Sequence, residues 1–256
     1  AVGAGKGGVG KSTVAVNLAI GLARAGHAVG LLDGDIYGPS LPTMLGLDDL
    51  EVTGSNNAVD PFRVHGIEAM SLGSLVEADK ALIWRGPMAH GAFKQLVTQT
   101  RWGQLDYLII DLPPGTGDVP LTMSQTLPLT GAVVVCTPQK VAQDDARRAV
   151  AMFQQLGVDV LGIVENMSYF IADDGKEYDL FGRGGAEVLA QKTGLPYLGA
   201  IPINPALRRN CDAGDPVANF EQDDQLAAEL NAVVRATKRE VEVREATVSL
   251  PTMNVT

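Results

Sequence analysis

Cysteine is scarce in this chain of 256 residues, where only Cys136 and Cys211 occur. The two cysteines lie far apart in the sequence and form neither a C-x-x-C pair nor a disulfide framework. A disulfide-stapled secreted domain is therefore excluded, and the cytoplasm is the expected compartment.

Long apolar runs and an excess of basic residues are also missing. No run reaches the length of about eighteen apolar residues that a membrane-spanning helix needs. Thirty Asp and Glu residues against twenty Lys and Arg residues give a formal net charge of −10, which argues against a broad nucleic-acid-binding surface. We therefore expect neither a membrane nor a nucleic acid among the partners.

Short apolar runs alternate with amphipathic stretches along the chain. The expected strands are Ala1–Ala4, Ala28–Asp33, Tyr107–Asp111, Ala132–Cys136, Val158–Glu165 and Tyr197–Ile201. The expected helices are Lys11–Ala25, Pro87–Thr100, Ala142–Leu156, Ala186–Thr193 and Gln222–Lys238. Buried strands that alternate with helices predict an α/β fold, with a mostly parallel β-sheet covered by helices on both faces.

No interior linker and no repeat divides the chain, so residues 1–256 are expected to form a single domain. Residues 51–83 look more irregular and predict an excursion that contains a hairpin. Residues 241–256 alternate apolar and polar side chains in part. This last pattern predicts either an edge strand or a tail.

The stretch "GAGKGGVGKST" (residues 3–13) matches two phosphate-binding signatures at once. Gly3, Gly5 and Gly8 spell the dinucleotide-binding pattern G-x-G-x-x-G, and Asp33 follows the second strand, where that pattern places an acid. The same stretch spells G-x-x-x-x-G-K-[ST], the P-loop pattern. The longer pattern occurs by chance in only roughly one chain in a hundred of this length, so we favour the P-loop.

A P-loop assigns a role to each of its residues. The backbone of Gly5, Gly7, Gly8, Val9 and Gly10 is expected to surround the phosphates, because loop amides and a helix N-terminus both favour an anion. The remaining roles fall on three side chains: Lys11 neutralises the β- and γ-phosphates, Ser12 binds Mg²⁺, and Thr13 bonds the α-phosphate.

Acidic residues end two of the expected strands. Asp111 ends the strand in "YLIIDLPPGTGD" and is expected to reach Mg²⁺ through water, and Gly115 follows at a distance suited to a γ-phosphate contact. Asp33 and Asp35 follow the second strand. We expect Asp35 to position the attacking water, and Asp33 to support Mg²⁺ or the loop. A strand-end acid without function is the alternative for Asp111, and a helix-capping turn is the alternative for Asp35.

The motifs occur in a characteristic order: "GKGGVGKST", "LLDGDIYGPSLPTMLGL", "WRGPM", "LDYLIIDLPPGTGD", "TPQ", "ENMSYF", "FGRGGAE" and "IPINPALR". As an ordered set, they resemble the Mrp/ApbC family of P-loop ATPases, relatives of MinD, ParA and the nitrogenase iron protein. The resemblance extends from residue 1 to about residue 236. It implies the corresponding α/β fold, ATP and Mg²⁺ as ligands, and slow ATP hydrolysis that depends on a homodimer.

The same resemblance implies roles for three further residues. Lys6 is the additional lysine of this deviant P-loop, and it reaches across the dimer to the partner's phosphates, as an arginine finger does. Asn166 contacts the adenine base, with a loop cap as the alternative, and the region around Pro202 flanks the base. The family acts as an ATP-dependent carrier or scaffold for iron–sulfur clusters, which implies scaffold or client proteins as partners.

The sequence departs from the family where that family carries a C-x-x-C after "NMSYF". Ala172, Asp173, Asp174 and Gly175 stand at that place, and carboxylates are poor ligands for iron–sulfur clusters. Both cysteines of the chain are expected to be structural. An iron–sulfur cluster is thus a possible ligand that the cysteines of this chain do not support.

Two other functions stay open at this stage. One is a positioning ATPase of the ParA/MinD kind, which would require a basic surface or a basic amphipathic helix. The other is a nucleotide-regulated interaction protein with little turnover. Trp84 and Arg85, in "WRGPM", are expected to belong either to a dimer or partner surface or to the packing of the protein.

Overall fold

The computed structural model describes residues 1–35, 38–48, 50–55, 58–75, 86–115, 126–172 and 174–248. Its helices are α1 (Lys11–Arg24), α2 (Leu41–Leu45), α3 (Gly86–Gln99), α5 (Lys140–Gln155), α6 (Gly185–Thr193), α7 (Pro205–Asp212) and α8 (Asp224–Val248), with 3₁₀ turns η1 (Leu72–Leu75) and η2 (Pro216–Phe220). All five predicted helices are present. Trp84, Arg85 and Asp173 lie outside the described residues.

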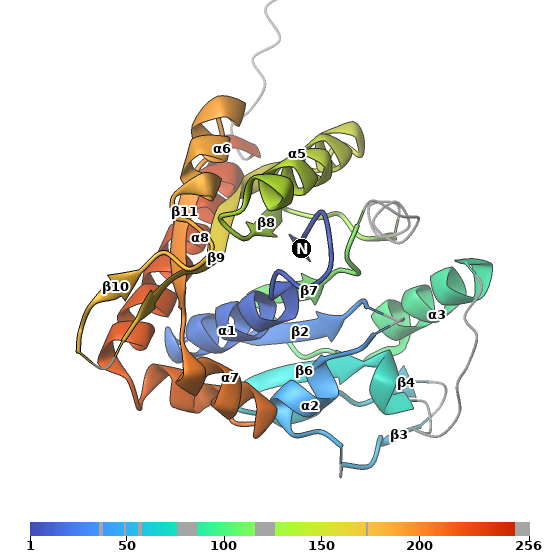
Figure 1. The fold of residues 1–256 in the computed structure, drawn as a ribbon. Helices are drawn as coiled ribbons and strands as arrows, with labels where there is room; N and C mark the ends of the chain where they lie inside the picture. The colour runs from blue at the N-terminus through green and yellow to red at the C-terminus, as the bar shows by residue number, and fades with distance from the viewer. Residues whose placement is uncertain are drawn as a thin grey trace, which may run out of the picture.

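A nine-stranded sheet forms the middle of the structure (Figure 1). Its strands are β1 (Val2–Gly3), β2 (Val29–Asp33), β5 (Phe62–Val64), β6 (Ile67–Ser71), β7 (Tyr107–Asp111), β8 (Ala132–Cys136), β9 (Val160–Ile171), β10 (Glu177–Tyr178) and β11 (Tyr197–Ile203). The order is β10-β9-β8-β1-β7-β2-β6-β5, and β11 pairs with β9. The pairs are parallel except for β5 with β6 and β10 with β9.

Helices pack on both faces of the sheet, as predicted, and each face has its own apolar core. One core joins the sheet to α1, α2, α7 and α8, and the other joins it to α3, α5 and α6. Strand β8 contributes to both cores, because Val133 and Val135 face the first while Val134 and Cys136 face the second. A strand buried on both faces is therefore apolar throughout, and this property made it recognisable in the sequence.

The irregular region contains the expected hairpin, formed by β5 and β6. His65 and Gly66 connect the two strands with φ angles of 54° and 78°, as a tight two-residue hairpin turn requires. A second small pair, β3 (Gly54–Ser55) with β4 (Ala58–Val59), lies outside the main sheet. The sequence did not predict that β6 would join the main sheet, parallel to β2.

The prediction of an edge strand or tail from residue 241 is wrong for residues 241–248, because α8 continues as a helix to Val248. Tertiary contacts override the alternating pattern. Val241 packs against the first core, and Arg244 forms an ion pair with Asp159 at 2.6 Å. Residues 249–256 of this prediction lie outside the described residues, and the prediction of a single domain stays untested.

Strand β9 is tied to α6 by the carboxylate of Glu165, which is fully buried. This carboxylate accepts hydrogen bonds from the Ser168 hydroxyl (2.6 Å) and from the backbone amides of Gly184 (2.9 Å) and Ala186 (2.7 Å). Gly184 is the N-cap of α6 and has no side chain to cap the helix. Glu165 therefore caps α6 from the neighbouring strand, and the contact joins the segments "ENMS" and "RGGAE" in space.

We expect Glu165→Ala to lower the free energy of unfolding by at least about 2 kcal/mol, because two buried donors and one part-buried donor lose their acceptor. Urea unfolding followed by circular dichroism measures this loss. Glu187→Ala is the matched control. Glu187 is an exposed acid in the first turn of α6, and its removal costs less than about 1 kcal/mol. Equal losses in the two variants would show that Glu165 does not act as a buried cap.

Candidate functional site

The predicted site residues meet at the carboxyl ends of the central strands. Strand β1 lies between β7 and β8, so the chain leaves β1 at a point where strand order reverses. In open α/β sheets, ligands bind at this kind of switch point. The register aligns Val2 with Asp111 and Asp33 with Asp111, which brings the glycine-rich loop and both strand-end acids to one place.

The glycine-rich loop has the backbone shape of an anion-binding loop. Gly8 and Gly10 adopt φ angles of 80° and 78°, which side chains other than glycine rarely tolerate. Gly10 is the N-cap of α1, and no side chain caps that helix. The first amides of α1 consequently lack side-chain acceptors, and a phosphate group is suited to accept from them.

Two glycines of the loop are required by close packing. A Cβ at Gly5 would lie 2.0 Å from the backbone oxygen of Asp145 in α5, and a Cβ at Gly10 would lie 2.1 Å from Nδ2 of Asn166. Neither separation is possible between real atoms. Gly5 therefore allows the loop to approach α5, and Gly10 allows it to approach β9.

The side chain of Lys11 lies at the centre of the site and is only 7% exposed. Its ammonium group forms an ion pair with Asp111 at 2.6 Å, donates to the Ser12 hydroxyl at 3.2 Å, and lies 3.9 Å from the Asp35 carboxylate. The structure thus brings together four of the residues that the sequence singled out. A buried cation within reach of a helix N-terminus is suited to a polyphosphate.

Asp111 has the properties of a residue that binds Mg²⁺. It is fully buried, and within the described part of the chain its Oδ2 atom has no hydrogen-bond partner. Burial raises the pKa of Asp111, while the Lys11 ammonium beside it lowers the pKa. An unpaired buried carboxylate oxygen is costly, and a bound cation or its water would satisfy it.

The described residues contain no group of three or more His, Cys, Asp or Glu side chains that could hold a metal by themselves. This finding is compatible with Mg²⁺, which binds through one or two protein ligands and completes its shell with water and phosphate oxygens. Ser12 and Asp111 are the residues that fit such an arrangement.

Asp33 does not fit the expected direct role at the metal, because internal donors already engage both of its oxygens. The amide of Asp35 donates to Oδ1 at 3.0 Å, and the Leu41 amide and Ser71 hydroxyl donate to Oδ2 at 3.4 and 3.0 Å. Burial, and then the charge of Asp111, raise the pKa of Asp33 to about 7. Asp33 supports the loop, which was the other half of the prediction.

These contacts also bear on the alternative role of Asp35. The first amide of α2 belongs to Leu41, and it donates to Asp33. The carboxylate of Asp35 lies instead 3.9 Å from Lys11. Asp33, and not Asp35, thus accepts from the first amide of the helix. The position of Asp35 beside Lys11 is compatible with the predicted role in positioning the attacking water.

Lys6 lies at the surface of the loop, with its side chain 39% exposed. Its ammonium group is 3.9 Å from Asp145 in α5, and Asp145 also pairs with Arg148. Lys6 is therefore accessible from outside the chain. Its predicted role across a dimer stays a prediction.

Asn166 and Pro202 lie on neighbouring strands, because Ile201 of β11 pairs with Asn166 of β9. The register shifts around Pro202, since proline has no amide to donate to the ladder. The carboxamide of Asn166 is buried and donates to the Val9 carbonyl at 2.8 Å. Asn166 thus supports the P-loop directly, and its contact with adenine, like that of Pro202, stays a prediction.

The backbone amide of Gly115 is already in use. It donates to the carbonyl of Ala4 at 3.0 Å, and Gly115 has a φ angle of 92°. A contact between this amide and a γ-phosphate would therefore require the bond to Ala4 to break. The predicted phosphate role of Gly115 stays untested.

Both cysteines are buried, which agrees with the structural role expected of them. Cys136 is 1% exposed, and burial raises the pKa of its thiol to about 12. Cys211 is 4% exposed, lies in α7, and accepts a long hydrogen bond from Asn219 at 3.6 Å. Iron binds the thiolate form of cysteine. Both thiols are buried, and burial disfavours that form.

The segment that replaces the C-x-x-C connects β9 to β10 as a hairpin turn. Its amides bond across the turn, from Ala172 to the Lys176 carbonyl (2.9 Å) and from Gly175 to the Ala172 carbonyl (2.8 Å). Asp174 pairs with Lys176 at 3.0 Å. The described part of this turn offers one carboxylate, already paired, and no soft ligand.

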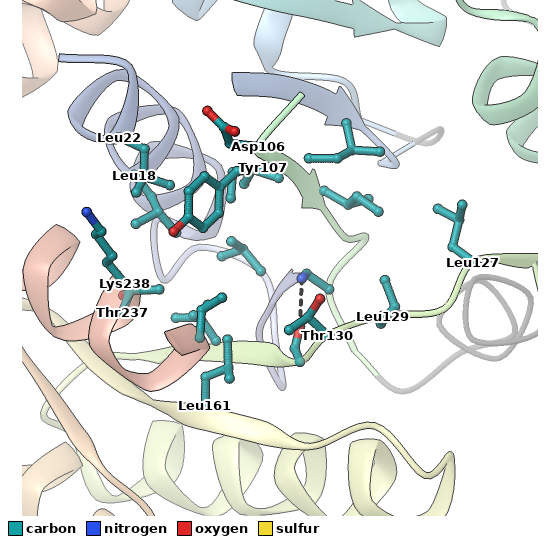
Figure 2. Close-up of a pocket in the computed structure, with 18 of the residues that line it drawn as sticks. Leu18, Leu22, Asp106, Tyr107, Leu127, Leu129, Thr130, Leu161, Thr237 and Lys238 are labelled. Atoms are coloured by element: carbon teal, nitrogen blue, oxygen red, sulfur yellow. Dashed lines mark hydrogen bonds between the residues drawn. The ribbon is translucent and has the colours of Figure 1, made fainter. Parts of the chain in front are cut away.

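A cavity of about 270 Å³ lies at the opposite end of the central strands, beside their amino ends (Figure 2). Leu18 and Leu22 of α1 line it together with Tyr107, and the amino group of Ala1 donates to Gly131 at 2.9 Å. None of the predicted site residues lines this cavity. The site is therefore identified by its chemistry and not by the size of a cavity.

A parallel sheet, a glycine-rich loop at a helix N-terminus, a buried lysine and a strand-end aspartate together define a P-loop NTPase. Residues 1–238 match the family model described as ParA: NUBPL iron-transfer P-loop NTPase. The chain belongs to this family.

Two relatives are about half identical in sequence to this chain. An iron–sulfur cluster carrier protein of Synechocystis is 51% identical over 241 residues, which cover 92% of this chain and 68% of the relative. An iron–sulfur cluster transfer protein NUBPL of Dictyostelium discoideum is 46% identical, over 95% of this chain and 76% of the relative. The chain thus matches roughly two thirds to three quarters of the length of these relatives.

Solved structures support the same fold. A nucleotide-binding protein of Archaeoglobus fulgidus in complex with ADP has a TM-score of 0.76 and 39% identity, over 88% of each chain. The cell division ATPase MinD of Pyrococcus furiosus has a TM-score of 0.70 and 22% identity, over 93% of this chain and 97% of that one. At this low identity, the likeness to MinD shows the fold alone. As for membranes, none of the helices in the described ranges combines the length and apolarity needed to cross one.

We expect Lys11→Ala to weaken nucleotide binding by at least about tenfold, because the main cation facing the phosphates is lost. Isothermal titration calorimetry with ATP and Mg²⁺ measures the affinity. Lys192→Ala, which removes an exposed lysine from α6, is the matched control and should leave binding unchanged.

Lys11→Ala also leaves Asp111 buried without its partner, which costs about 3–5 kcal/mol of stability. A melting curve is therefore recorded for each variant, and the double variant Lys11→Ala/Asp111→Asn removes both charges together. A folded Lys11 variant with wild-type affinity for ATP would contradict the assignment of the site.

Proposed function

We propose that the protein binds and slowly hydrolyses ATP with Mg²⁺ as a homodimer, and that it acts in the assembly or transfer of iron–sulfur clusters. The observation that carries the ATP-dependent part is the buried contact between Lys11 and Asp111, set at the N-terminus of α1. The names of the relatives support the iron–sulfur part.

In this proposal, each residue of the site has one task. The loop amides and Lys11 hold the phosphates, while Ser12 and Asp111 hold Mg²⁺. When bound, the metal would neutralise negative charge on the phosphates. Asp35 positions the attacking water. Its carboxylate lies 3.9 Å from the Lys11 ammonium, whose closer partner is Asp111 at 2.6 Å, so Asp35 is near the phosphate site but is not the main partner of the lysine.

Lys6 completes the site from the second subunit. Its exposure on the loop surface supports this role, and so does its distance of 3.9 Å from Asp145, because a contact this long between charged groups is easily exchanged. A cation that arrives only on dimerisation makes hydrolysis depend on assembly.

We expect Lys6→Ala and Asp35→Ala to be slow ATPases separately, and activity to return when the two are mixed. In a mixed dimer, the chain with Lys6→Ala keeps its own Asp35 and receives the intact Lys6 of the other chain. Random exchange gives half mixed dimers with one intact site each, so recovery reaches at most about a quarter of wild-type activity. Phosphate release measures this activity.

The control for the mixing experiment is a mixture of Lys6→Ala with the double variant Lys6→Ala/Asp35→Ala, in which no dimer holds an intact site. Mixed dimers are verified by native mass spectrometry. Absence of recovery despite verified mixed dimers would show that Lys6 acts in its own subunit.

The iron–sulfur role requires soft ligands that the described residues of this chain do not present at the surface. We therefore propose that the cluster is cargo, handled with ligands from a scaffold or client protein and not held by four thiolates of this chain alone. The burial of Cys136 and Cys211 supports this view.

We expect anaerobic reconstitution with iron and sulfide to leave far fewer than about four iron atoms per dimer, the content of one four-iron cluster held by four thiolates. Iron and sulfide analysis after gel filtration gives the count. The variant Cys136→Ser/Cys211→Ser should behave like the wild type. A stoichiometric cluster that this double variant abolishes would overturn the expectation.

A further inference from the structure

Ser71 ends strand β6 and is fully buried, with a relative exposure of 0%. Strands β2 and β6 are parallel neighbours, and their register places Ser71 beside Asp33. The Ser71 hydroxyl donates to Oδ2 of Asp33 at 3.0 Å and accepts from the Gly73 amide at 3.0 Å. A single hydroxyl thus links the end of β6, and the turn after it, to the carboxylate that ends β2.

The carboxylate of Asp33 continues the connection in two directions. Through Oδ1 it accepts from the amide of Asp35, and through Oδ2 it accepts from the amide of Leu41 at the start of α2. The two ends of the loop between β2 and α2 are therefore fixed on one side chain. Asp35 has its own carboxylate 3.9 Å from Lys11.

We propose that Ser71 is a positioning residue for hydrolysis: it orients the Asp33 carboxylate, which in turn fixes the backbone of Asp35 beside Lys11. The geometry explains why Ser71 is needed for this orientation. Both oxygens of Asp33 lie in a buried environment near the charge of Asp111, so the carboxylate is held in place by its donors and not by solvent. Within the described part of the chain, Ser71 is the one side chain that donates to Asp33; the other two donors are the backbone amides of Asp35 and Leu41, at the two ends of the loop that is being positioned.

The proposal rests on the proposed function for its kinetic readout. We expect Ser71→Ala to lower kcat for ATP by about tenfold, which corresponds to one hydrogen bond to a charged group. The affinity for ATP should change less than about twofold, because none of the hydrogen bonds that Ser71 and Asp33 form in the described structure involves the glycine-rich loop. The separation of kcat from affinity distinguishes positioning from a general loss of structure.

Two further variants sharpen the kinetic test. Thr237→Val removes a buried hydroxyl from α8, where it bonds the Val233 carbonyl far from the loop, and is expected to keep the wild-type kcat. In the background of Asp33→Asn, Ser71→Ala should have little additional effect on kcat, because it acts through Asp33. If Ser71→Ala is too unstable to assay, Ser71→Cys keeps a weaker donor of similar size and should give an intermediate kcat.

A second readout does not depend on hydrolysis. Amide hydrogen exchange, followed by NMR, should be faster for Asp35 and Leu41 in Ser71→Ala than in the wild type and in Thr237→Val. If the wild type does not hydrolyse ATP, the proposed function fails, and the exchange rates still decide the role of Ser71.

Three results would overturn the proposal. The first is a wild-type kcat in folded Ser71→Ala, with unchanged exchange at Asp35 and Leu41. The second is an equal loss of kcat in Thr237→Val. The third is a full additive loss when Ser71→Ala is combined with Asp33→Asn, because Ser71 would then act independently of Asp33.

Discussion

The ion pair between Lys11 and Asp111 is the interaction on which the site depends. It joins the first residue of α1 to the last residue of β7 at 2.6 Å, and both side chains are buried. Removing two charges from water is costly, and a buried pair is favourable only when its geometry is close and further hydrogen bonds complete it. Here the completion is partial, since one oxygen of Asp111 stays unpaired among the described residues.

This incomplete pairing connects stability to function. In the proposed function, a phosphate group at the loop would compete with Asp111 for Lys11, and Asp111 would be one of the residues that hold Mg²⁺. In the proposed function, the carboxylate that holds Lys11 in position is also the one that would bind the metal. Lys11 and Asp111 are thus already buried and paired in the structure, so the fold itself carries part of the cost of desolvating these two charges.

Strand β9 connects the nucleotide loop to the region where the family carries its thiols. Asn166 bonds the Val9 carbonyl of the loop, and its neighbour Glu165 caps α6. Successive side chains of a strand point to opposite faces, so two adjacent residues bind elements on the two sides of the sheet. Beyond them, β9 leads to β10, and Asp174 between the two strands pairs with Lys176. The contact of Asn166 with the loop and the turn after β9 thus lie at separate places along one strand.

The sequence by itself determined the α/β class, the five long helices, and the glycine-rich loop with Lys11 and Asp111, because apolar periodicity and glycine spacing are local properties. Only the tertiary structure decided the role of Asp33. Its three donors come from β6, from α2 and from the loop, and no local pattern indicates that these segments meet. The same holds for Glu165, whose acceptor role depends on α6 lying beside β9, and for residues 241–248, where packing of Val241 and the pair of Arg244 with Asp159 favour a helix over the alternating pattern. A buried polar group is satisfied by whichever donors the fold brings to it, and that partner is fixed by chain topology and not by the residues next to it in sequence.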